Sequence, residues 1–425
     1  MQTYQKMKDS GVAWLGDIPS EWDQKQARYI FKQTKDSVGE DPSKYELLSL
    51  TLRGIIPRSQ VDGGKNPENY SAYQIVREND LVMCLFDYDV TPRTVGLATS
   101  TGMVTGAYTN LRPLNGISTR YFNYFFLALD TTKELLHLCT GLRNGISKQT
   151  FFSLNLPVPE YETQEIIADY LDEETAKIDD LISKQEHLLK LIEEKKKATI
   201  NWAVTKGINP TVELASSGVT WIGQMPEHWQ IKQIKHISPV KRGASPRPIE
   251  DPKYFDKNGE FNWVRIADVT RSGKYLLSTP QKLSILGASL SVKQYPGDIF
   301  VSIAASVGKP MITKIQCCIH DGFVYFPYID EKMIEREFLY YIFDAGQCYL
   351  GLGKMGTQLN LNTETIGSIK IAIPPLDEQL EIVEWIRSYE KEYGKLKALA
   401  DKQVVLLKER RMSLVSNAVT GKVRV

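Results

Sequence analysis

Arginine, amide and carboxylate side chains gather in several turn-rich segments of this 425-residue chain. These types hydrogen bond to base edges in DNA: arginine to guanine, amides to adenine and carboxylates to cytosine. The candidates in the first half are Thr51, Arg53, Arg58, Asp87, Asp89, Arg93, Arg143, Asn144, Lys148 and Gln149. Those in the second half are Lys241, Arg242, Ser245, Arg247, Arg265, Asp268, Lys354, Thr357, Gln358 and Asn360. Any one of these residues could instead be a solvated or locally paired surface charge. A cluster of them is therefore stronger evidence for a DNA contact than any single member.

The sequence lacks the motifs of enzymes that transform DNA or nucleotides. It contains no GxxxxGK[ST] phosphate loop, because "GLGKMG" at Gly351 has the wrong spacing and no Ser or Thr follows Lys354. It also lacks the Asn/Asp-Pro-Pro-aromatic motif of an amino-methyltransferase, and its "IPPL" at Ile373 is interpreted as a corner between a strand and a helix. The histidines are scattered and indicate no Ser/His/Asp grouping. We therefore predict a non-catalytic chain that binds no cofactor itself.

The cysteines point to a reduced protein without a metal centre. The chain has five of them, an odd number, and no CxxC pair. Cys317, Cys318 and His320 could in principle bind a metal, but they lie in an apolar, strand-like run with no convincing second ligand pair. Cysteine prefers protein interiors, so buried thiols are expected.

Net charge and hydropathy narrow the class of protein further. The formal net charge is only +1, which argues against a nonspecific DNA binder coated in positive charge. If DNA is the ligand, the contacts must be local, and a partner must supply much of the phosphate neutralisation. No apolar run approaches the roughly 18 residues that span a bilayer, and the first residues lack the apolar core of a signal peptide. We expect a cytoplasmic protein with no membrane partner.

The chain repeats itself at the scale of a domain. "SGVAWLGDIPSEW" from Ser10 returns as "SGVTWIGQMPEHW" from Ser217, and "LNLPVPEYETQEIIADYL" from Leu154 matches "IKIAIPPLDEQLEIVEWI" from Ile369. Each copy has a Trp-containing start, a region of strands and turns, and a long helix. The sequence thus predicts globular regions at 1–160 and 210–374, a central helix at 161–209 and a distal helix at 375–425.

Two long helices are predicted because proline is absent and the apolar residues recur at nearly seven-residue spacing. Between Glu160 and Asn209 about 43 residues can form one helix roughly 64 Å long. The candidate helix-pairing or partner-facing residues are Leu171, Ile178, Leu181, Leu188, Ile192, Ile386, Tyr393, Leu396, Leu407 and Leu414.

Each apolar stripe, taken alone, is explained by docking on its own globular region, whereas the duplication favours pairing of the two helices with each other. The expected fold is mixed α/β (α+β). Two globular domains are joined by two long helices, packed as an antiparallel coiled coil with a pseudo-twofold repeat.

Several segments, in order, resemble the specificity (S) subunits of type I restriction-modification systems. The segment "LDEETAKIDDLISKQEHLLKLIEEKKKATINWAVTKG" from Leu171 looks like the central spacer of that family, and "IPPLDEQLEIVEWI" from Ile373 like the start of its distal spacer. The start "SGVAWLGDIPSEW" and the internal segments "LLSLTLRGIIPR", "YQIVRENDLV", "VTGAYTNLRP", "KRGASPRP", "FNWVRIADV", "YPGDIFVSI" and "GTQLNL" are similar as well. One departure is Thr163, which replaces an acidic residue of the usual "PPLDEQ" pattern.

The resemblance implies that each globular region is a target-recognition domain for one half of a bipartite double-stranded DNA site. The helices would act as a ruler and dock two methyltransferase (M) subunits, and restriction (R) subunits would add DNA cleavage. S-adenosylmethionine would then belong to the methyltransferase partner, and ATP and magnesium to the restriction partner.

Two other classes of function are considered. A coiled-coil adaptor without DNA contact predicts featureless globular regions, whereas these carry basic and amide-rich loops. A self-contained nuclease or methyltransferase would need the missing motifs. The repeated tryptophans Trp14, Trp22, Trp221 and Trp229 could stack on bases, but core packing explains better why both copies share them. Shared residues are therefore expected to form the scaffold, and unshared loop residues to set specificity.

Overall fold

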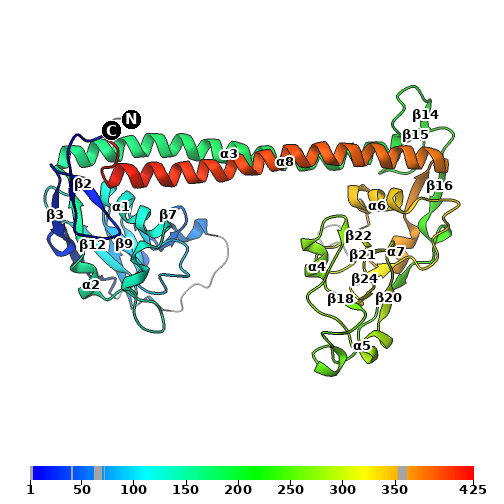
Figure 1. Ribbon diagram of the computed structural model, residues 1–425, viewed down its shortest axis with the longest axis horizontal. Helices are drawn as coiled ribbons and strands as arrows, with labels where there is room; N and C mark the ends of the chain where they lie inside the picture. The colour runs from blue at the N-terminus through cyan, green and yellow to red at the C-terminus, as the bar shows by residue number, and fades with distance from the viewer. Residues whose placement is uncertain (1–2, 40–41, 62–68, 71, 353–360) are drawn as a thin grey trace. The chain divides into compact units, whose positions relative to one another are not determined.

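The computed structural model describes residues 3–39, 42–61, 69–70, 72–352 and 361–425. The chain forms two compact units, one of residues 1–186 with 402–425 and the other of residues 187–401. Each unit mixes short strands with helices, as the sequence predicts, and each is described by itself below (Figure 1).

The first unit is built on a four-stranded sheet in the order β10-β9-β12-β4, flanked by a three-stranded sheet β11-β8-β5 and a hairpin β6-β7. Aromatic residues of α1 fill its core, because Phe122, Phe125 and Phe126 pack against Phe31 and Leu81. α1 begins after Ser118, whose Oγ accepts a hydrogen bond from the Tyr121 amide at 3.3 Å. The elements are β1 (Met7–Asp9), β2 (Asp17–Pro19), β3 (Asp23–Gln26), β4 (Phe31–Thr34), β5 (Asp36–Ser37), β6 (Leu48–Thr51), β7 (Gly54–Pro57), β8 (Tyr73–Val76), β9 (Leu81–Met83), β10 (Val95–Leu97), β11 (Gly102–Thr105), β12 (Thr109–Pro113), α1 (Thr119–Thr131), α2 (Lys148–Phe152), β13 (Asn155–Val158) and the start of α3 (Tyr161–Lys206).

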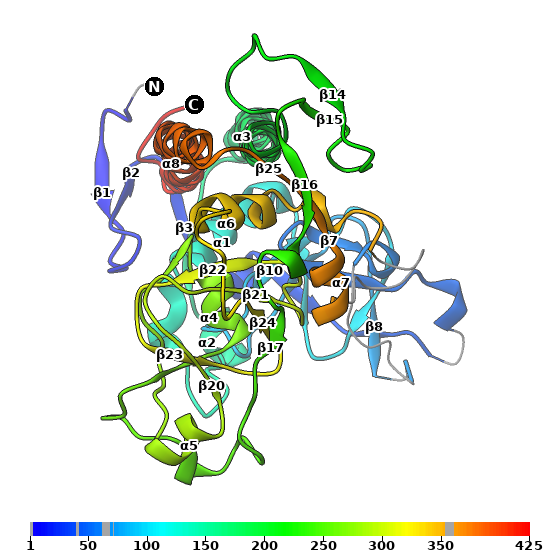
Figure 2. The same cartoon turned by 90° about the vertical axis from the view of Figure 1, so that its right-hand side faces the viewer.

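The second unit is built on a five-stranded sheet in the order β17-β24-β21-β22-β19, with a three-stranded sheet β18-β23-β20 beside it. α6 lies between the sheets and the long helices, and α5 lies at the end of the unit far from those helices (Figure 2). Its elements are β14 (Leu214–Ser216), β15 (Gln224–Pro226), β16 (Gln230–Gln233), β17 (Lys241–Arg242), β18 (Asn262–Val264), α4 (Ile266–Arg271), β19 (Tyr275–Leu276), α5 (Ile285–Ser289), β20 (Val292–Gln294), β21 (Ile299–Ser302), β22 (Pro310–Thr313), β23 (Cys317–Ile319), β24 (Phe323–Tyr325), α6 (Arg336–Ala345), α7 (Thr363–Ser368), β25 (Lys370–Ile373) and the start of α8 (Leu376–Val419).

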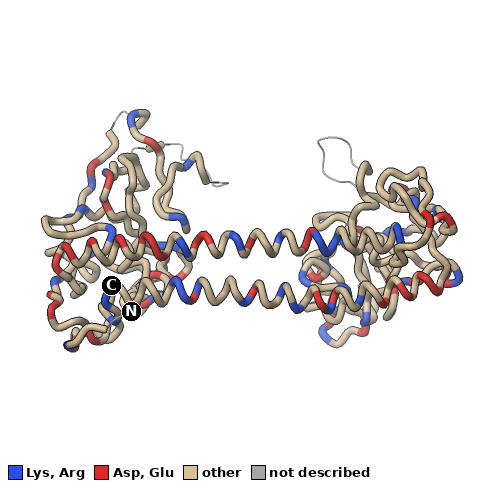
Figure 3. Tube along the Cα trace, turned by 90° about the horizontal axis from the view of Figure 1, so that it is seen from above, with Lys and Arg blue, Asp and Glu red and all other residues tan. Residues whose placement is uncertain are grey.

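Both predicted long helices are confirmed, α3 with 46 residues and α8 with 44. They run antiparallel in the first unit, where Arg411 Nε donates to Asp179 Oδ1 at 2.7 Å and Gln185 Nε2 donates to Gln403 Oε1 at 2.6 Å. In the second unit the two helices also lie side by side, and the ring centroids of Trp202 on α3 and Trp385 on α8 are separated by 6.1 Å. Charges of both signs follow each helix (Figure 3).

The candidate helix-pairing residues fall into a buried set and an exposed set. Leu171, Ile178, Ile192, Ile386 and Leu414 are buried, and most of them join the core of their own unit. Tyr393 and Leu407 are half-buried. Leu181, Leu188 and Leu396 are 49%, 42% and 52% exposed. Leu171 and Ile178 of α3 thus share the core of the first unit with Leu414 of α8, Ile386 lies in the core of the second unit, and polar pairs add contacts between the helices.

Two ionic clusters fix the globular regions to the helices. In the first unit, Arg120 of α1 donates to Glu165 at 3.1 Å and to Asp169 at 2.7 Å on α3, and also pairs with Asp172. In the second unit, Glu337 of α6 accepts hydrogen bonds from Arg387 of α8 at 2.9 Å and from Lys274 at 2.6 Å. Burial raises the pKa of Glu337, but the bonds from Arg387, Lys274 and Tyr275 outweigh it and lower the pKa to about 2.

A buried glutamine makes the same three hydrogen bonds in both copies. Gln164 Nε2 donates to the Pro159 carbonyl at 2.8 Å and to the Gly116 carbonyl at 3.4 Å, and its Oε1 accepts from the Ser118 amide at 2.8 Å. Gln379 donates to the carbonyls of Pro374 and Met333, both at 2.9 Å, and accepts from the Glu335 amide at 2.8 Å. The repeated motif therefore fastens the start of each long helix to the segment preceding α1 or α6.

The tryptophans belong to the scaffold, as expected. Trp22 and Trp229 are buried, and Trp14 and Trp221 pack partly buried against the two cores. Trp229 Nε1 donates to Glu378 Oε1 at 3.1 Å.

Four of the five cysteines are buried free thiols, as expected, and Cys139 is half-buried. Cys317 and Cys318 lie in β23, and burial raises the pKa of both to about 12. Among the described residues, no group of three His, Cys, Asp or Glu side chains is placed to hold a metal ion.

Candidate nucleic-acid interface

Two loops of the first unit bring four of the candidate residues together. Backbone hydrogen bonds join the loops, since the Asp87 amide donates to the Arg143 carbonyl at 2.6 Å and the Ile146 amide to the Leu85 carbonyl at 2.8 Å. Arg143 Nε also donates to Asp87 Oδ1 at 3.0 Å, and Asn144 Nδ2 to Asp89 Oδ2 at 2.8 Å. These bonds hold an arginine and an amide at an exposed turn.

The arginine of this turn is held in a defined orientation. The guanidinium lies over the Phe86 ring at 4.8 Å, and the hydrogen bond from Arg143 lowers the pKa of Asp87. The side chain of Arg143 nevertheless remains 68% exposed. A ligand can therefore reach it.

Arg93 links this cluster to the β6-β7 hairpin. Its Nη1 donates to the Leu52 carbonyl at 2.7 Å and its Nε to the Val95 carbonyl at 2.8 Å. Burial lowers the pKa of Arg93. One donor of Arg93 therefore supports the hairpin tip, and another bonds to β10.

The other candidates of the first unit lie on that hairpin or at the start of a short helix. On the tip, Thr51 Oγ1 accepts from the Arg53 amide at 3.1 Å, and Arg53 Nη2 donates to the Gln60 carbonyl at 2.9 Å. Arg58 and Thr51 line a shallow cavity of about 270 Å³. Lys148 and Gln149 are exposed at the start of α2.

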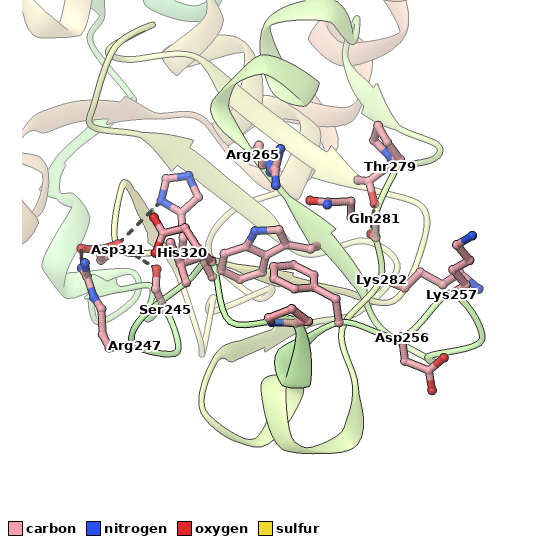
Figure 4. A pocket seen from close by; sticks show the side chains of 16 residues that line it. Ser245, Arg247, Asp256, Lys257, Arg265, Thr279, Gln281, Lys282, His320 and Asp321 are labelled. Atoms are coloured by element: carbon pink, nitrogen blue, oxygen red, sulfur yellow. Dashed lines mark hydrogen bonds and ion pairs between the residues drawn. The ribbon is translucent and has the colours of Figure 1, made fainter.

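A larger cavity of about 1180 Å³ lies in the second unit (Figure 4). Three candidates, Ser245, Arg247 and Arg265, contribute to its lining. The sequence did not propose the other polar lining residues as base-reading candidates, and these are Glu250, Asp256, Lys257, Thr279, Gln281, Lys282, Asp321 and His320, which was considered only as a possible metal ligand. Only Asp256 and Lys257 carried a signal, because they fall in the turn-rich segment "DPKYFDKNGE".

Asp321 organises one side of this cavity. It accepts hydrogen bonds at 2.9 Å from Ser245 Oγ and from Arg247 Nη2, and its carbonyl accepts from Arg242 Nε. Burial would raise the pKa of Asp321, but Ser245, the backbone and Arg247 together lower it.

The neighbouring His320 is held in its neutral form. Burial, more than the charges of Arg242 and Arg265, lowers its pKa despite Asp321. Its Nδ1 accepts from the Gly322 amide at 2.8 Å, so the imidazole presents an acceptor inside the protein at neutral pH.

Of the remaining candidates of the second unit, those that the structure describes do not line the cavity. Asp268 is buried and accepts from the Arg265 amide at 2.9 Å, so it fixes the backbone where α4 begins. Lys241 is exposed on β17. Lys354, Thr357, Gln358 and Asn360 lie outside the described residues.

Comparison with known proteins identifies the family. Residues 100–191 and 226–402, more than half of the chain, match the type I restriction modification DNA specificity domain. The chain belongs to this family. As a specificity-family protein it contains two stretches that match the domain, one in each copy of the repeat, and the resemblance stated from the sequence is confirmed.

Relatives and solved structures agree with the assignment. The chain is 25% identical over 374 residues to the type I restriction enzyme MjaVIII specificity subunit of Methanocaldococcus jannaschii, covering 83% of this chain and 80% of the relative. It is 23% identical over 431 residues to the putative MjaX specificity subunit of the same organism, covering 97% and 96%.

A solved chain described under "Structural basis underlying complex assembly and conformational transition of the type I R-M system" has the same fold. Its TM-score is 0.71 at 15% identity, with 96% of this chain and 99% of that chain covered.

In the part of the chain that the structure describes, no helix is both long and apolar enough to cross a membrane.

Proposed function

We propose that this chain is the DNA-reading, non-catalytic subunit of a type I restriction-modification complex. Regions 1–160 and 210–374 each read one half of a bipartite double-stranded DNA site, and the helices at 161–209 and 375–425 carry them. The observation that supports this most is the division of residues within the repeat. The buried framework recurs in both copies, whereas the loops with base-reading groups differ between them.

The two sets of loops offer the chemistry that base reading requires. The first region exposes Arg143 and Asn144 on joined loops, and the second exposes Arg265 and a set of polar groups around a cavity. Guanidinium and amide groups on a fixed backbone discriminate purine edges in the major groove. Specificity would therefore arise from the unshared loops, while the shared framework holds them.

Methyltransferase subunits would dock on the long helices, and restriction subunits would join that complex. The helices retain exposed apolar side chains suited to such contacts, namely Leu181, Leu188, Leu191, Leu396, Leu399, Val405 and Leu406. Protein interfaces depend on apolar anchors of this kind. The near-neutral charge of the chain also fits a subunit whose partner supplies phosphate contacts.

The test is reconstitution with a type I methyltransferase subunit that assembles with the chain. Alone, the chain is expected to methylate nothing and to bind DNA weakly, and with the partner it should bind one bipartite duplex tightly and in a salt-dependent manner. Methyl transfer by the chain alone, with S-adenosylmethionine supplied, would contradict the proposal. A coiled-coil adaptor without DNA readout is the alternative, and it predicts a complex that assembles but has no sequence preference.

A further inference from the structure

The cavity of the second unit has two sides with different hydrogen-bonding states. Asp321, Ser245 and Arg247 lie together on one side, and Arg265, Gln281 and Thr279 lie on another (Figure 4). On the first side, Asp321 already satisfies Ser245 and Arg247 through bonds of 2.9 Å. The Ser245 hydroxyl and one donor of Arg247 are therefore engaged within the protein.

The other side keeps polar groups without partners. Gln281 Oε1 is buried and has no hydrogen-bond partner among the described residues. The side chains of Arg265, Lys257 and Lys282 likewise make no hydrogen bond or ion pair with any described residue, although all three line the cavity. A buried amide left unpaired costs about 1–3 kcal/mol. Gln281 also lines the cavity, so a ligand bound there is placed to satisfy this oxygen once the amide turns towards it.

The fold holds these groups on adjoining backbone segments. The Trp263 amide of β18 donates to the Gln281 carbonyl at 2.8 Å, and the Leu283 amide donates to the Phe261 carbonyl at 2.9 Å. Arg265 directly follows β18, and Asp268 fixes its amide. Arg265 and Gln281 are therefore placed by paired backbone rather than by a free loop, as contacts that discriminate bases require.

The charges around the cavity favour base edges over a purely phosphate-binding role. Lys257, Lys282 and Arg265 are balanced in part by Glu250 and Asp256, so the lining is mixed and not uniformly basic. Amides match the N6 and N7 atoms of adenine, and guanidinium groups match the O6 and N7 atoms of guanine.

We propose that Gln281 and Arg265 read an adenine and a guanine in the half-site recognised by the second globular region. Lys257 and Lys282 then contact the adjoining phosphates. This inference rests on the proposed function. It assigns base reading to a side of the cavity where Arg265 was the one residue that the sequence analysis named as a candidate. Arg247, engaged by Asp321, supports the opposite side.

The experiment uses the full chain reconstituted with its methyltransferase and a library of duplexes whose methylated sites are sequenced. Gln281→Leu should relax the requirement for one base pair of one half-site, reducing discrimination there by about 5- to 150-fold, and leave the other half-site unchanged. Arg265→Ala should do the same at a different base pair. Lys282→Met should weaken binding to all sequences alike and reduce the salt slope by about one. Lys253→Met is the matched control, because Lys253 pairs with Asp251 at 2.8 Å outside the cavity lining.

Gln281→Glu is a second variant that keeps the size of the side chain. A carboxylate accepts from the N4 amino group of cytosine, so the preferred base at that position should change and not merely relax. Unchanged base requirements in both Gln281 variants, or equal weakening on all sequences, would overturn this inference while leaving the proposed function intact. A wild-type complex without any sequence preference would instead remove the proposed function.

Discussion

The buried glutamine at the start of α8 offers a sharp test of the repeated framework. Gln379→Met keeps the approximate volume of the side chain but removes its hydrogen bonds to Pro374, Met333 and Glu335. Each is worth about 0.5–1.5 kcal/mol net, so the three together contribute about 3 kcal/mol to the local stability of the second unit. That energy corresponds to a roughly 100-fold larger equilibrium constant for local opening.

Amide hydrogen exchange is the appropriate assay, because a chain with two compact units does not unfold as a single two-state system. The Glu335 amide, which donates to Gln379, should lose its protection, while amides of the first unit keep theirs. Gln230→Met, at an exposed position of β16 in the same unit, is the control and should change little. Undiminished protection of Glu335 in the Gln379 variant, or equal loss in both units, would refute the reasoning. The sequences methylated by the reconstituted complex should stay the same.

Three further outcomes follow from particular contacts. Gly421→Ala should destabilise the first unit, because Gly421 has a φ of +69° and an added Cβ would meet Pro19 Cδ at 2.3 Å. Gly394→Ala, where an added Cβ meets nothing within 4 Å, should stabilise α8 by about 0.5–1 kcal/mol. Thermal melts distinguish the two variants. The lowered pKa of Glu337 contributes stability that is present above about pH 4.5 and lost as the pH falls towards 2. Glu337→Gln should therefore destabilise the second unit at pH 7. In urea titrations it should also make the stability of that unit depend less on pH. Inserting four residues after Gln185, and four at its partner on α8, lengthens each helix by about 6 Å and turns it by about 400°, so each helix presents nearly the same face. The gap between the half-sites of the methylated DNA should then widen by one or two base pairs. Insertions of two residues turn each helix by about 200° and should prevent assembly.

The framework could be predicted from the sequence because local patterns determine it. The absence of proline and the apolar spacing predicted α3 and α8, and the "IPPL" segment at Ile373 predicted a corner between a strand and a helix, observed between β25 and α8. The duplicated motifs also indicated which residues are scaffold. Gln164 stands in one of these repeated motifs, but its three hydrogen bonds depend on the segment preceding α1, which no local pattern specifies.

The candidate site was less predictable because its residue types are common on any surface. The sequence alone does not show that Arg93 donates hydrogen bonds to the carbonyls of Leu52 and Val95, or that Arg247 pairs with Asp321. It also gave no reason to choose Gln281, whose position depends on pairing with β18 and whose importance lies in an unsatisfied buried oxygen. Tertiary pairing decides which polar groups remain free.

The central claim is that two separate regions of one chain each read their own half of a DNA site. The most direct measurement replaces residues 210–374 with the corresponding region of a relative that has a different specificity. The methylated sites of the wild-type and hybrid complexes are then sequenced. The expected result is a bipartite motif in which one half and the gap are retained while the other half changes. A hybrid complex that assembles and methylates but changes both halves, or neither, would contradict the account.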